Sequence, residues 1–396
     1  MRIFISTGEV SGDLQGAMLI EALQRQAADL DLRLEILALG GDRMAAAGAT
    51  LLGNTTSIGS VGLVEALPFV VPTWQIQRRA RRYLRQHPPD VLVLIDYPGP
   101  NLAISSYLHT CLPQVPIVYY IAPQDWAVPQ LGNAKRIAHV VHRLLAIFPE
   151  EARYYRHQGV AVSWVGHPLL DRLESAPSRT EARMALGIEP EQMAITLLPA
   201  SRRQELNYLL PVICEVASHI QQRLPQVQFW IPVSLPSFRS TIQAAVNRWG
   251  LRATLVEGKT LAVLAAADLA IAKSGTVNLE TALLNVPQVV LYRVHPVTAW
   301  VVRRLLKLSV PFMSPPNLVV MKPIVPELLQ EEATPARIVQ ESLALLLDER
   351  RRIQTLADYQ QMRAQLGEVG VCDRAAREIL DVAQTLPADN ECEKLK

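Results

Sequence analysis

The chain has 396 residues, of which 49% are hydrophobic and 19% charged, and its formal net charge is +2 at pH 7. A chain of this length exceeds the size at which a single hydrophobic core keeps growing, so we expect two domains. The apolar composition excludes a disordered chain. The small net charge gives no global electrostatic reason to expect a nucleic-acid partner.

The four cysteines lie far apart and form no CxxC pair. This spacing argues against a structural zinc site or a disulfide framework and is typical of a protein in a reducing cytoplasm. The N-terminal apolar run meets Gly8 and Glu9 too early to be the core of a signal peptide. No stretch contains the roughly 18 uninterrupted apolar residues that a membrane-spanning helix needs. We therefore expect a protein that is soluble or bound to a membrane surface.

In the first half of the chain, short apolar runs alternate with helical patterns. The run at 91–95 is continuously apolar, as is typical of strands buried on both faces of a parallel sheet. Strands that alternate with helices predict βαβ units and a doubly wound sheet. We expect a helix at 16–28 and strands at 2–6, 34–39, 91–95, 117–121, 144–148 and 162–165.

A second series of the same kind follows a polar stretch at 174–183. The fold class is therefore α/β, with two Rossmann-like doubly wound parallel-sheet domains facing a cleft. We expect an N-terminal domain at 1–170, a C-terminal domain at 171–355, and a helical segment at 356–396 that packs back on the first domain. The strands of the second series are expected at 195–198, 228–231, 254–256, 269–272 and 288–292.

The loop after the first strand combines glycines with the carboxylates of Glu9 and Asp13. Glycines permit a close approach of the backbone to a ligand. The carboxylates would repel a pyrophosphate, whereas the hydroxyls of a sugar can donate hydrogen bonds to them. We interpret Ser11, Gly12 and Asp13 as a sugar-binding loop. The alternative is that Ser11 or Asp13 only caps the following helix.

Asp96 follows the buried run at 91–95, at the end of a strand where a ligand-binding cleft is expected. A hydroxyl nucleophile needs a proton acceptor, and Asp96 is the best candidate for a general base in the chain. The alternative is an aspartate that only forms a turn close to Pro98.

Two strand-to-helix turns of the second domain carry residues suited to a diphosphate. Hydroxyl groups, backbone N–H groups and an arginine bind phosphate oxygens well. Glu280, in the helix after the second turn, can accept hydrogen bonds from two ribose hydroxyls; the alternative is an acid favoured by the helix dipole. The residues of the two turns are Ser201, Arg202, Ser274, Gly275 and Thr276.

Three further motifs are ambiguous by residue chemistry alone. The segments 315–318 and 326–332 indicate helix starts and nothing more. His167 stands in a Gly-His-Pro sequence, and a lone histidine is more often a hydrogen-bonding residue than a catalyst.

Together these motifs resemble those of the lipid-A-disaccharide synthases, a family of inverting glycosyltransferases with the two-domain fold called GT-B. Each short segment is a weak signal, but all occur in the order of the family and cover most of the chain. The segments are GExSGD at 8–13, IDYP at 95–98, WA at 126–127, VGH at 165–167, LLPxSR at 197–202, SGTxxLE at 274–280, YR at 292–293, PNL at 316–318 and ELLQEE at 327–332.

The resemblance implies that UDP-2,3-diacylglucosamine donates its sugar to 2,3-diacylglucosamine 1-phosphate. The products are the β-1,6-linked lipid A disaccharide 1-phosphate and UDP. By position, Asp96 matches the catalytic base, Glu9 a second carboxylate important for activity, and Arg202, Glu280 and Asn317 donor-site residues. The resemblance also implies that no metal or other cofactor is needed, because basic groups and helix N-termini stabilise the departing UDP.

Both implied substrates carry acyl chains, so we expect a further partner, the anionic inner face of the bacterial inner membrane. The segment 61–74 includes Phe69, Val70 and Trp74, and its two prolines argue against a long core helix. A similar pairing of apolar and basic residues recurs at 300–307. The alternative is that the apolar segment packs under the first domain and the arginines form a solvated helix face. The arginines that follow the segment 61–74 in the sequence are Arg78, Arg79, Arg81, Arg82 and Arg85.

The chain departs from the pattern of the family at positions expected beside the cleft, so its acyl or sugar preference can differ. One rival reading is a UDP-N-acetylglucosamine 2-epimerase or the peptidoglycan N-acetylglucosaminyl transferase. Another is a sugar-nucleotide-binding protein with an inactive cleft. The sequence leaves open whether the chain forms a homodimer. The departures are Gly99, Pro100, Val128, Pro129, Ala200 and Lys273.

Overall fold

The apolar runs of the sequence form two parallel sheets, each in a unit of its own. The computed structural model describes residues 1–56, 67–128, 132–200, 202–294 and 311–385. Unit 1 comprises Met1–Asp171 and Leu366–Lys396, and unit 2 comprises Arg172–Gln365. The boundary expected near residue 355 lies earlier than this division, because α17 (Glu349–Ala364) continues as one helix of unit 2.

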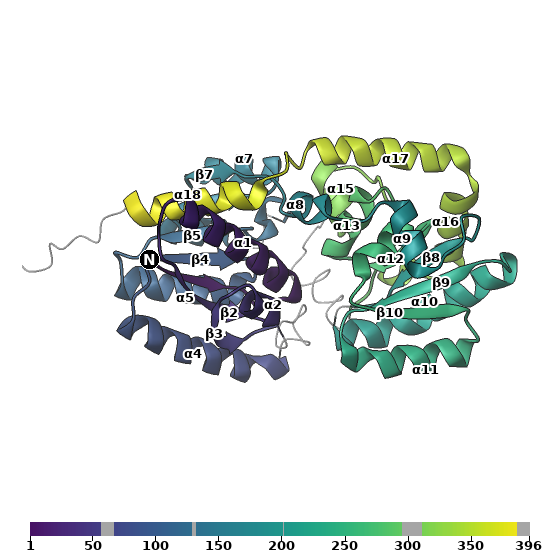
Figure 1. Ribbon diagram of the computed structural model, residues 1–396, viewed down its shortest axis with the longest axis horizontal. Coiled ribbons are helices and arrows are strands. Elements are labelled where there is room, and N and C mark those ends of the chain that lie inside the picture. The colour runs from purple at the N-terminus through teal and green to yellow at the C-terminus, as the bar shows by residue number, and fades with distance from the viewer. Residues whose placement is uncertain (57–66, 129–131, 201, 295–310, 386–396) are drawn as a thin grey trace, which may run out of the picture. The chain divides into compact units, whose positions relative to one another are not determined.

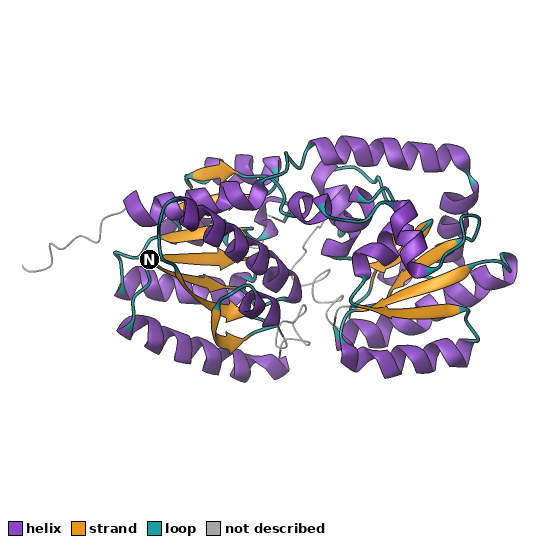
Figure 2. Cartoon of the chain, in the orientation of Figure 1, coloured by secondary structure: helices purple, strands orange, loops and turns teal. Residues whose placement is uncertain are grey.

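The sheet of unit 1 has seven strands in the order β3-β2-β1-β4-β5-β6-β7, and all neighbouring pairs are parallel. The order reverses direction between β1 and β4, as it does in Rossmann folds. Figure 2 shows the strands as orange arrows. Their bounds are β1 Arg2–Ser6, β2 Glu35–Gly40, β3 Thr50–Asn54, β4 Val91–Ile95, β5 Ile117–Tyr120, β6 Arg143–Ala146 and β7 Val162–Trp164.

Helices cover both faces of this sheet. On one face α1 (Val10–Asp29) packs side by side with α18 (Val371–Thr385), although the two are far apart in sequence (Figure 1). The other face carries α4 (Val70–Gln86), α5 (Pro98–Cys111) and α6 (Ala134–Val140), whose apolar side chains pack on those of the strands. The shorter elements are α2 Asp42–Ala46, α7 Pro149–His157, α8 Leu169–Glu174 and the 3₁₀ turns η1 Leu67–Phe69 and η2 Gln124–Trp126.

The sheet of unit 2 repeats this arrangement. Its six parallel strands have the order β10-β9-β8-β11-β12-β13. This order reverses direction between β8 and β11, as the order in unit 1 does between β1 and β4. Both units therefore have the strand order of a doubly wound Rossmann fold, which confirms the prediction of two α/β domains with parallel sheets. The bounds are β8 Ala194–Leu198, β9 Gln228–Val233, β10 Ala253–Glu257, β11 Leu269–Lys273, β12 Gln288–Tyr292 and β13 Glu327–Leu329.

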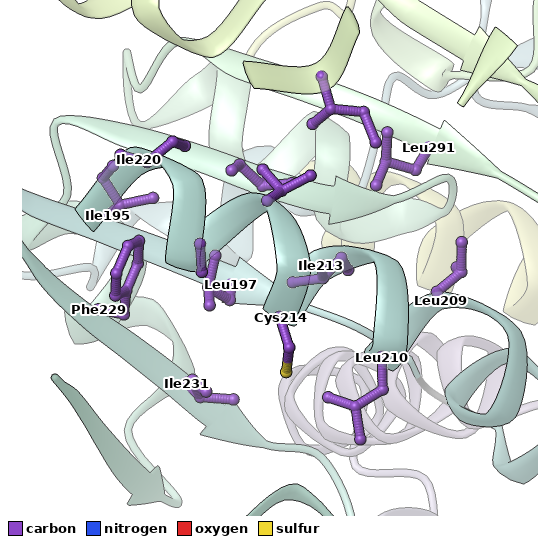
Figure 3. Packing of buried hydrophobic residues seen from close by; sticks show 14 of the residues in the cluster. Ile195, Leu197, Leu209, Leu210, Ile213, Cys214, Ile220, Phe229, Ile231 and Leu291 are labelled. Atoms are coloured by element: carbon purple, nitrogen blue, oxygen red, sulfur yellow. The ribbon is translucent and has the colours of Figure 1, made fainter. Parts of the chain in front are cut away.

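The main core of unit 2 lies between its sheet and α10 (Arg203–Arg223). Figure 3 shows Leu209, Ile213 and Cys214 of this helix among residues of the strands, such as Phe229 and Ile231. The helices α9 and α12 pack on the other face, against Ala194 and Trp230. The remaining elements of the unit are α9 Arg179–Leu186, η4 Pro236–Phe238, α11 Arg239–Trp249, α12 Thr260–Ala266, α13 Thr276–Leu283, α15 Pro315–Val320, η6 Gln330–Glu332 and α16 Pro335–Leu347.

Two edge strands differ from the expectation. The segment 326–332 was interpreted as a helix start, but it contains β13, which pairs with β12 at the edge of the sheet. The sequence also gave no signal for β3, whose residues are exposed or only half-buried. Neither strand needs a continuous apolar run, because most residues of both are not fully buried. The segment 315–318 does begin a helix, α15.

Candidate functional site

The predicted site residues of each unit lie at the point where the strand order reverses. In unit 1, β1 pairs with β4, with Ser6 opposite Leu94 at their carboxyl ends. In unit 2, β8 pairs with β11, with Leu198 opposite Ala272. Ligands of open α/β sheets bind outside the carboxyl ends of the strands at such a point. The topology therefore defines two candidate half-sites, one in each unit.

The glycines of the first half-site allow a close approach to the neighbouring loop. A Cβ atom at Gly8 would lie 2.1 Å from Cδ1 of Tyr97, and one at Gly12 would lie 1.9 Å from Oγ1 of Thr7. Neither position has room for a side chain. At Gly8 the loop after β1 packs directly against the loop after β4, whereas at Gly12 the start of α1 packs against Thr7 of its own loop. Glu9 is the N-cap residue of α1, and its backbone is extended.

Asp96 lies immediately after β4 in a strained backbone conformation. The φ angles of Asp96 and Tyr97 are +45° and +51°, in the left-handed region that non-glycine residues seldom adopt. The carbonyl of Asp96 accepts hydrogen bonds from Nδ2 of Asn101 at 2.6 Å and from the hydroxyl of Tyr119 at 2.9 Å. Its N–H donates to the carbonyl of Ile121 at 2.9 Å. Strain that is held in place by such contacts is typical of functional sites.

Tyr97, the residue after Asp96, lies near Glu9, the other predicted carboxylate of unit 1. Burial raises the pKa of Tyr97, a hydrogen bond with Thr73 lowers it, and the charge of Glu9 raises it again. Glu9 is thus near enough to act on the residue that follows Asp96. The structure brings the loops of these two residues together, with Gly8 against Tyr97.

The carboxylate of Asp13 accepts hydrogen bonds from the backbone of its own unit. Its side chain is buried and accepts hydrogen bonds from the N–H groups of Gly41, Met44 and Arg43 at 2.8, 3.1 and 3.2 Å. These are the first amides of α2, so the carboxylate caps a helix 28 residues away rather than its own. Ser11 and Gly12 lie in the first turn of α1.

A second buried carboxylate, Glu151, was missed from the sequence. It accepts hydrogen bonds from the N–H groups of Ile147, Phe148 and Ala122 at 2.7, 3.2 and 3.1 Å and so connects the ends of β5 and β6. The pKa of this carboxyl is raised to about 8. Burial is the main cause and the charge of Asp96 adds to it, while the hydrogen bonds from the three amides act in the opposite direction. Its only sequence signal is an acid in the first turn of α7, which is common at any helix start.

His167 is a buried neutral residue. Its Nδ1 accepts a hydrogen bond from the N–H of Leu169 at 3.2 Å, and its ring lies 5.3 Å from that of Phe148. Burial lowers the pKa of His167 to about 3. The imidazole therefore stays uncharged at physiological pH and acts as a hydrogen-bonding residue of the fold.

The second half-site begins with Arg202, the N-cap residue of α10. Glu205 accepts hydrogen bonds from the backbone N–H of Arg202 at 3.1 Å and from its Nη1 at 3.2 Å. Nζ of Lys273, at the end of β11, donates at 3.2 Å to Oε1 of Glu205, the oxygen that also accepts from Nη1 of Arg202. Two cationic side chains thus meet at the start of α10. Ser201 lies outside the described residues.

The Ser-Gly-Thr turn opens α13 beside these cations. The hydroxyl of Ser274 donates to the carbonyl of Met313 at 2.6 Å. The N–H of Gly275 donates to Oδ1 of Asn278 at 2.7 Å, and Thr276 is the first residue of the helix. The turn therefore presents the beginning of α13 at the carboxyl edge of the sheet, as expected for a phosphate-binding helix start.

Glu280 lies in the second turn of α13, and its side chain is 7% exposed. Nε of Arg172 donates to Oε1 of Glu280 at 2.8 Å. Arg172, which the sequence did not single out, thus compensates the buried charge and orients the carboxylate.

Asn317, predicted as a donor-site residue, is buried and bound to its own unit. Its Nδ2 donates to the carbonyl of Val325 at 3.0 Å and to Oε1 of Glu327 at 2.7 Å. Its Oδ1 accepts the N–H of Val325 at 2.9 Å. The side chain therefore holds the segment that leads into β13 against α15.

The first five residues of α4 include exposed apolar side chains. Val70, Val71 and Trp74 are 57%, 61% and 57% exposed, whereas Phe69 is half-buried. The helix was not expected because of Pro72, but this proline lies in the first turn, where no N–H partner is needed. The residues 61–66 and 300–307 of the predicted membrane segments lie outside the described residues.

Basic side chains continue this surface along α4. The guanidinium of Arg78 lies 5.2 Å from the ring centre of Trp74, and Arg79, Arg82 and Arg85 are exposed. Arg81 differs, because it turns inward and packs 5.4 Å from the ring centre of Tyr107. Within the part of the chain that the structure describes, no helix has the length and apolarity needed to cross a membrane.

The comparison with known proteins decides the family. A sequence model of the family described as lipid-A-disaccharide synthetase matches residues 3–382. The chain belongs to this family. Lipid-A-disaccharide synthase of Gloeothece citriformis is 63% identical over 96% of this chain and 100% of that protein. The enzyme of the same name from Synechocystis sp. is 56% identical over 97% and 98%.

Solved structures support the fold. UDP-N-acetylglucosamine 2-epimerase from Neisseria meningitidis, bound to UDP-N-acetylglucosamine, has a TM-score of 0.67 at 13% identity over 96% of this chain and 100% of that chain. A glycosyltransferase of kitacinnamycin has a TM-score of 0.61 at 15% identity over 98% and 99%. At such low identity the epimerase likeness extends to the fold only, so the rival reading as an epimerase is not favoured over the family.

The departures from the family pattern have different surroundings. A Cβ atom at Gly99 would meet nothing within 4 Å, so this position in the first turn of α5 has room for a side chain. Val128 is buried. Ala200 accepts a hydrogen bond from the hydroxyl of Ser234 at 3.1 Å through its carbonyl, a contact that does not depend on its side chain. Pro100 lies beside Gly99 in α5, and Pro129 lies outside the described residues.

Proposed function

We propose that this chain acts as a lipid-A-disaccharide synthase, an inverting glycosyltransferase of lipid A biosynthesis. The observation that carries the proposal is the match to this family over residues 3–382, including the motifs at both strand reversals. The geometry adds a chemical reason. One half-site carries carboxylates and the other carries cations at helix starts, as a reaction between a hydroxyl and a nucleoside diphosphate sugar requires.

The proposed substrates are UDP-2,3-diacylglucosamine and 2,3-diacylglucosamine 1-phosphate. The acceptor 6-hydroxyl attacks C1 of the donor sugar, the bond from C1 to the β-phosphate oxygen breaks, and UDP leaves with the electron pair. In our proposal Asp96 takes the proton of the hydroxyl, with Glu9 in the adjoining loop. The carboxylate position at the end of β4, fixed by the strained backbone, supports this role.

The proposed donor site is the half-site of unit 2. Arg202 and the turn at 274–276 would bind the diphosphate, and Glu280 would accept hydrogen bonds from the ribose hydroxyls. We propose that Ser201 contributes a hydroxyl, and that Asn317 supports the site through the segment before β13. Charge on the leaving group would be neutralised by these cations and helix starts, so no metal or other cofactor is part of the proposal.

Incubation with radiolabelled UDP-diacylglucosamine, with and without the acceptor monosaccharide 1-phosphate, tests the proposal. A labelled tetraacyl disaccharide that forms only in the presence of the acceptor is the expected result. Conversion of the UDP-sugar without acceptor would indicate epimerase chemistry instead. Binding of the UDP-sugar without any turnover would indicate an inactive binding protein.

We further propose that the enzyme works at the anionic inner face of the inner membrane, where acylated substrates reside. The exposed apolar turn of α4 and the arginines after it support this location. Each arginine near an anionic surface contributes about 1 kcal/mol to binding.

A further inference from the structure

The structure places the side chain of Lys273 in surroundings that the sequence does not reveal. It is the last residue of β11, next to the central strand β8, and its side chain is 14% exposed. A lysine ammonium that is this far removed from water is stable only beside an opposite charge or a strong acceptor.

The ammonium group lies between two helix starts. Its Nζ is 3.2 Å from Oε1 of Glu205, which is in the first turn of α10. A Cβ atom at Gly275, the N-cap residue of α13, would lie 3.0 Å from the same Nζ. Lys273 therefore touches the beginnings of both helices that follow the strand reversal of unit 2.

The charges of this cluster favour an anionic ligand. Arg202 and Lys273 share one carboxylate, that of Glu205, so the three side chains together carry one excess positive charge. The N-termini of α10 and α13 add their partial positive charges. Two cations held by one carboxylate are also fixed in place before a ligand binds, which lowers the reorganisation needed during reaction.

We propose that Lys273 is a further catalytic residue, which contacts the β-phosphate of the UDP-sugar and stabilises UDP as it departs. This inference rests on the proposed function. When the bond between C1 and the β-phosphate oxygen breaks, its electron pair stays on that oxygen, and the acceptor oxygen forms the new bond to C1. The negative charge on the β-phosphate grows during this step, so a cation beside it stabilises the transition state more than the bound substrate.

Calorimetry with uridine, UMP and UDP tests the contact, because only UDP has a β-phosphate. For Lys273→Met we expect the Kd of UDP to rise about ten-fold or more, since a charge-assisted contact is lost, while the Kd of uridine stays within about two-fold. The kcat of transfer should fall by about ten-fold or more, and Lys273→Arg should restore part of both losses. Equal weakening of uridine and UDP would show a merely structural role, and unchanged UDP affinity would exclude the contact.

Lys259→Met is the matched control, since Lys259 is exposed and follows β10 at the edge of the same sheet. It removes one lysine charge from the same unit and should change neither affinity nor turnover. If Lys273→Met does not fold, as a melting curve would reveal, Lys273→Gln gives the same test with a smaller change in polarity. A wild type that forms no disaccharide would refute the proposed function, whereas normal turnover in the folded Lys273 variants would refute this inference alone.

Discussion

The two units have the same strand order and opposite chemistry at the point where that order reverses. In unit 1 the loops after β1 and β4 carry Glu9 and Asp96. In unit 2 the loop after β8 carries Arg202, and Lys273 is the last residue of β11. The topology thus selects where a ligand can bind, and the side chains at the strand ends select which ligand.

The backbone differs between the two half-sites as well. Asp96 and Tyr97 adopt left-handed φ angles, and hydrogen bonds from Asn101 and Tyr119 hold them there. Unit 2 instead uses capped helix starts, with Glu205 accepting from the N-cap amide of α10 and Asn278 from that of α13. A base must point a single side chain at a proton, whereas a diphosphate can be bound by several amides and cations at once.

The largest effect expected from this comparison is on the carboxylate side. Asp96→Asn should lower turnover by roughly 10²–10⁴-fold, because general-base catalysis is lost while the size of the side chain is retained. UDP affinity should stay unchanged, since the proposed donor site belongs to the other unit. Steady-state kinetics and calorimetry measure the two quantities. Asp29→Asn, at the exposed end of α1, is the control, and more than half of wild-type activity in Asp96→Asn would refute the assignment.

The surfaces of the units differ in a second way, through the exposed apolar turn and arginines of α4. Replacing Arg78, Arg79 and Arg82 by Gln should weaken binding to anionic vesicles by roughly 100-fold, at about 1 kcal/mol per charge. Co-sedimentation at rising salt concentration measures this, and Arg81 is left intact because it packs on Tyr107.

The control for vesicle binding removes the same number of exposed arginines from unit 2. These are Arg223, Arg248 and Arg350, each on a helix. Equal vesicle binding by the wild type and both triple variants would mean that the arginines of α4 are only a solvated helix face.

In unit 2 we expect the opposite of the result for Asp96→Asn, because variants of this half-site should lose UDP affinity. Arg202→Ala removes a charge-assisted contact to phosphate, and Glu280→Ala removes the proposed ribose contact. Each should weaken UDP binding by about 10- to 100-fold, as expected for lost hydrogen bonds to charged groups. If calorimetry gave wild-type UDP affinity for both variants, the donor would have to bind elsewhere.

The smallest effect concerns Arg172, which orients Glu280 at 2.8 Å. Arg172→Met should weaken UDP by about five-fold but 2′-deoxy-UDP by less, because the misplaced carboxylate loses mainly its ribose contact. Arg172→Lys should recover part of the difference. The control is Arg179→Met, whose partner Asp268 precedes β11 and thus lies at the amino end of this strand, opposite to the end that carries the half-site. If the ratio of the affinities for UDP and 2′-deoxy-UDP were the same in Arg172→Met as in the wild type, a positioning role of Arg172 would be excluded.

Much of the fold was readable from the sequence because buried parallel strands are apolar on both faces. The runs 91–95 and 288–292 agree with β4 and β12 to the residue. The motifs after the strands also identified the loops that carry Glu9, Asp96 and Arg202. These signals are local: a strand, a turn and a helix start each appear within a few neighbouring residues.

Only the tertiary structure decided how distant side chains are used. The structure shows that the carboxylate of Asp13, predicted beside a sugar, caps α2, and that the side chain of Asn317, predicted beside UDP, holds the segment before β13. Lys273 meets Glu205 across 68 residues of sequence, and Arg172 meets Glu280 across 108. Such pairs depend on the order of strands in the sheet, which no local pattern encodes. The sequence alone thus determined the buried strands and the chemistry of their loops, and the packing of the sheets determined which charges act together.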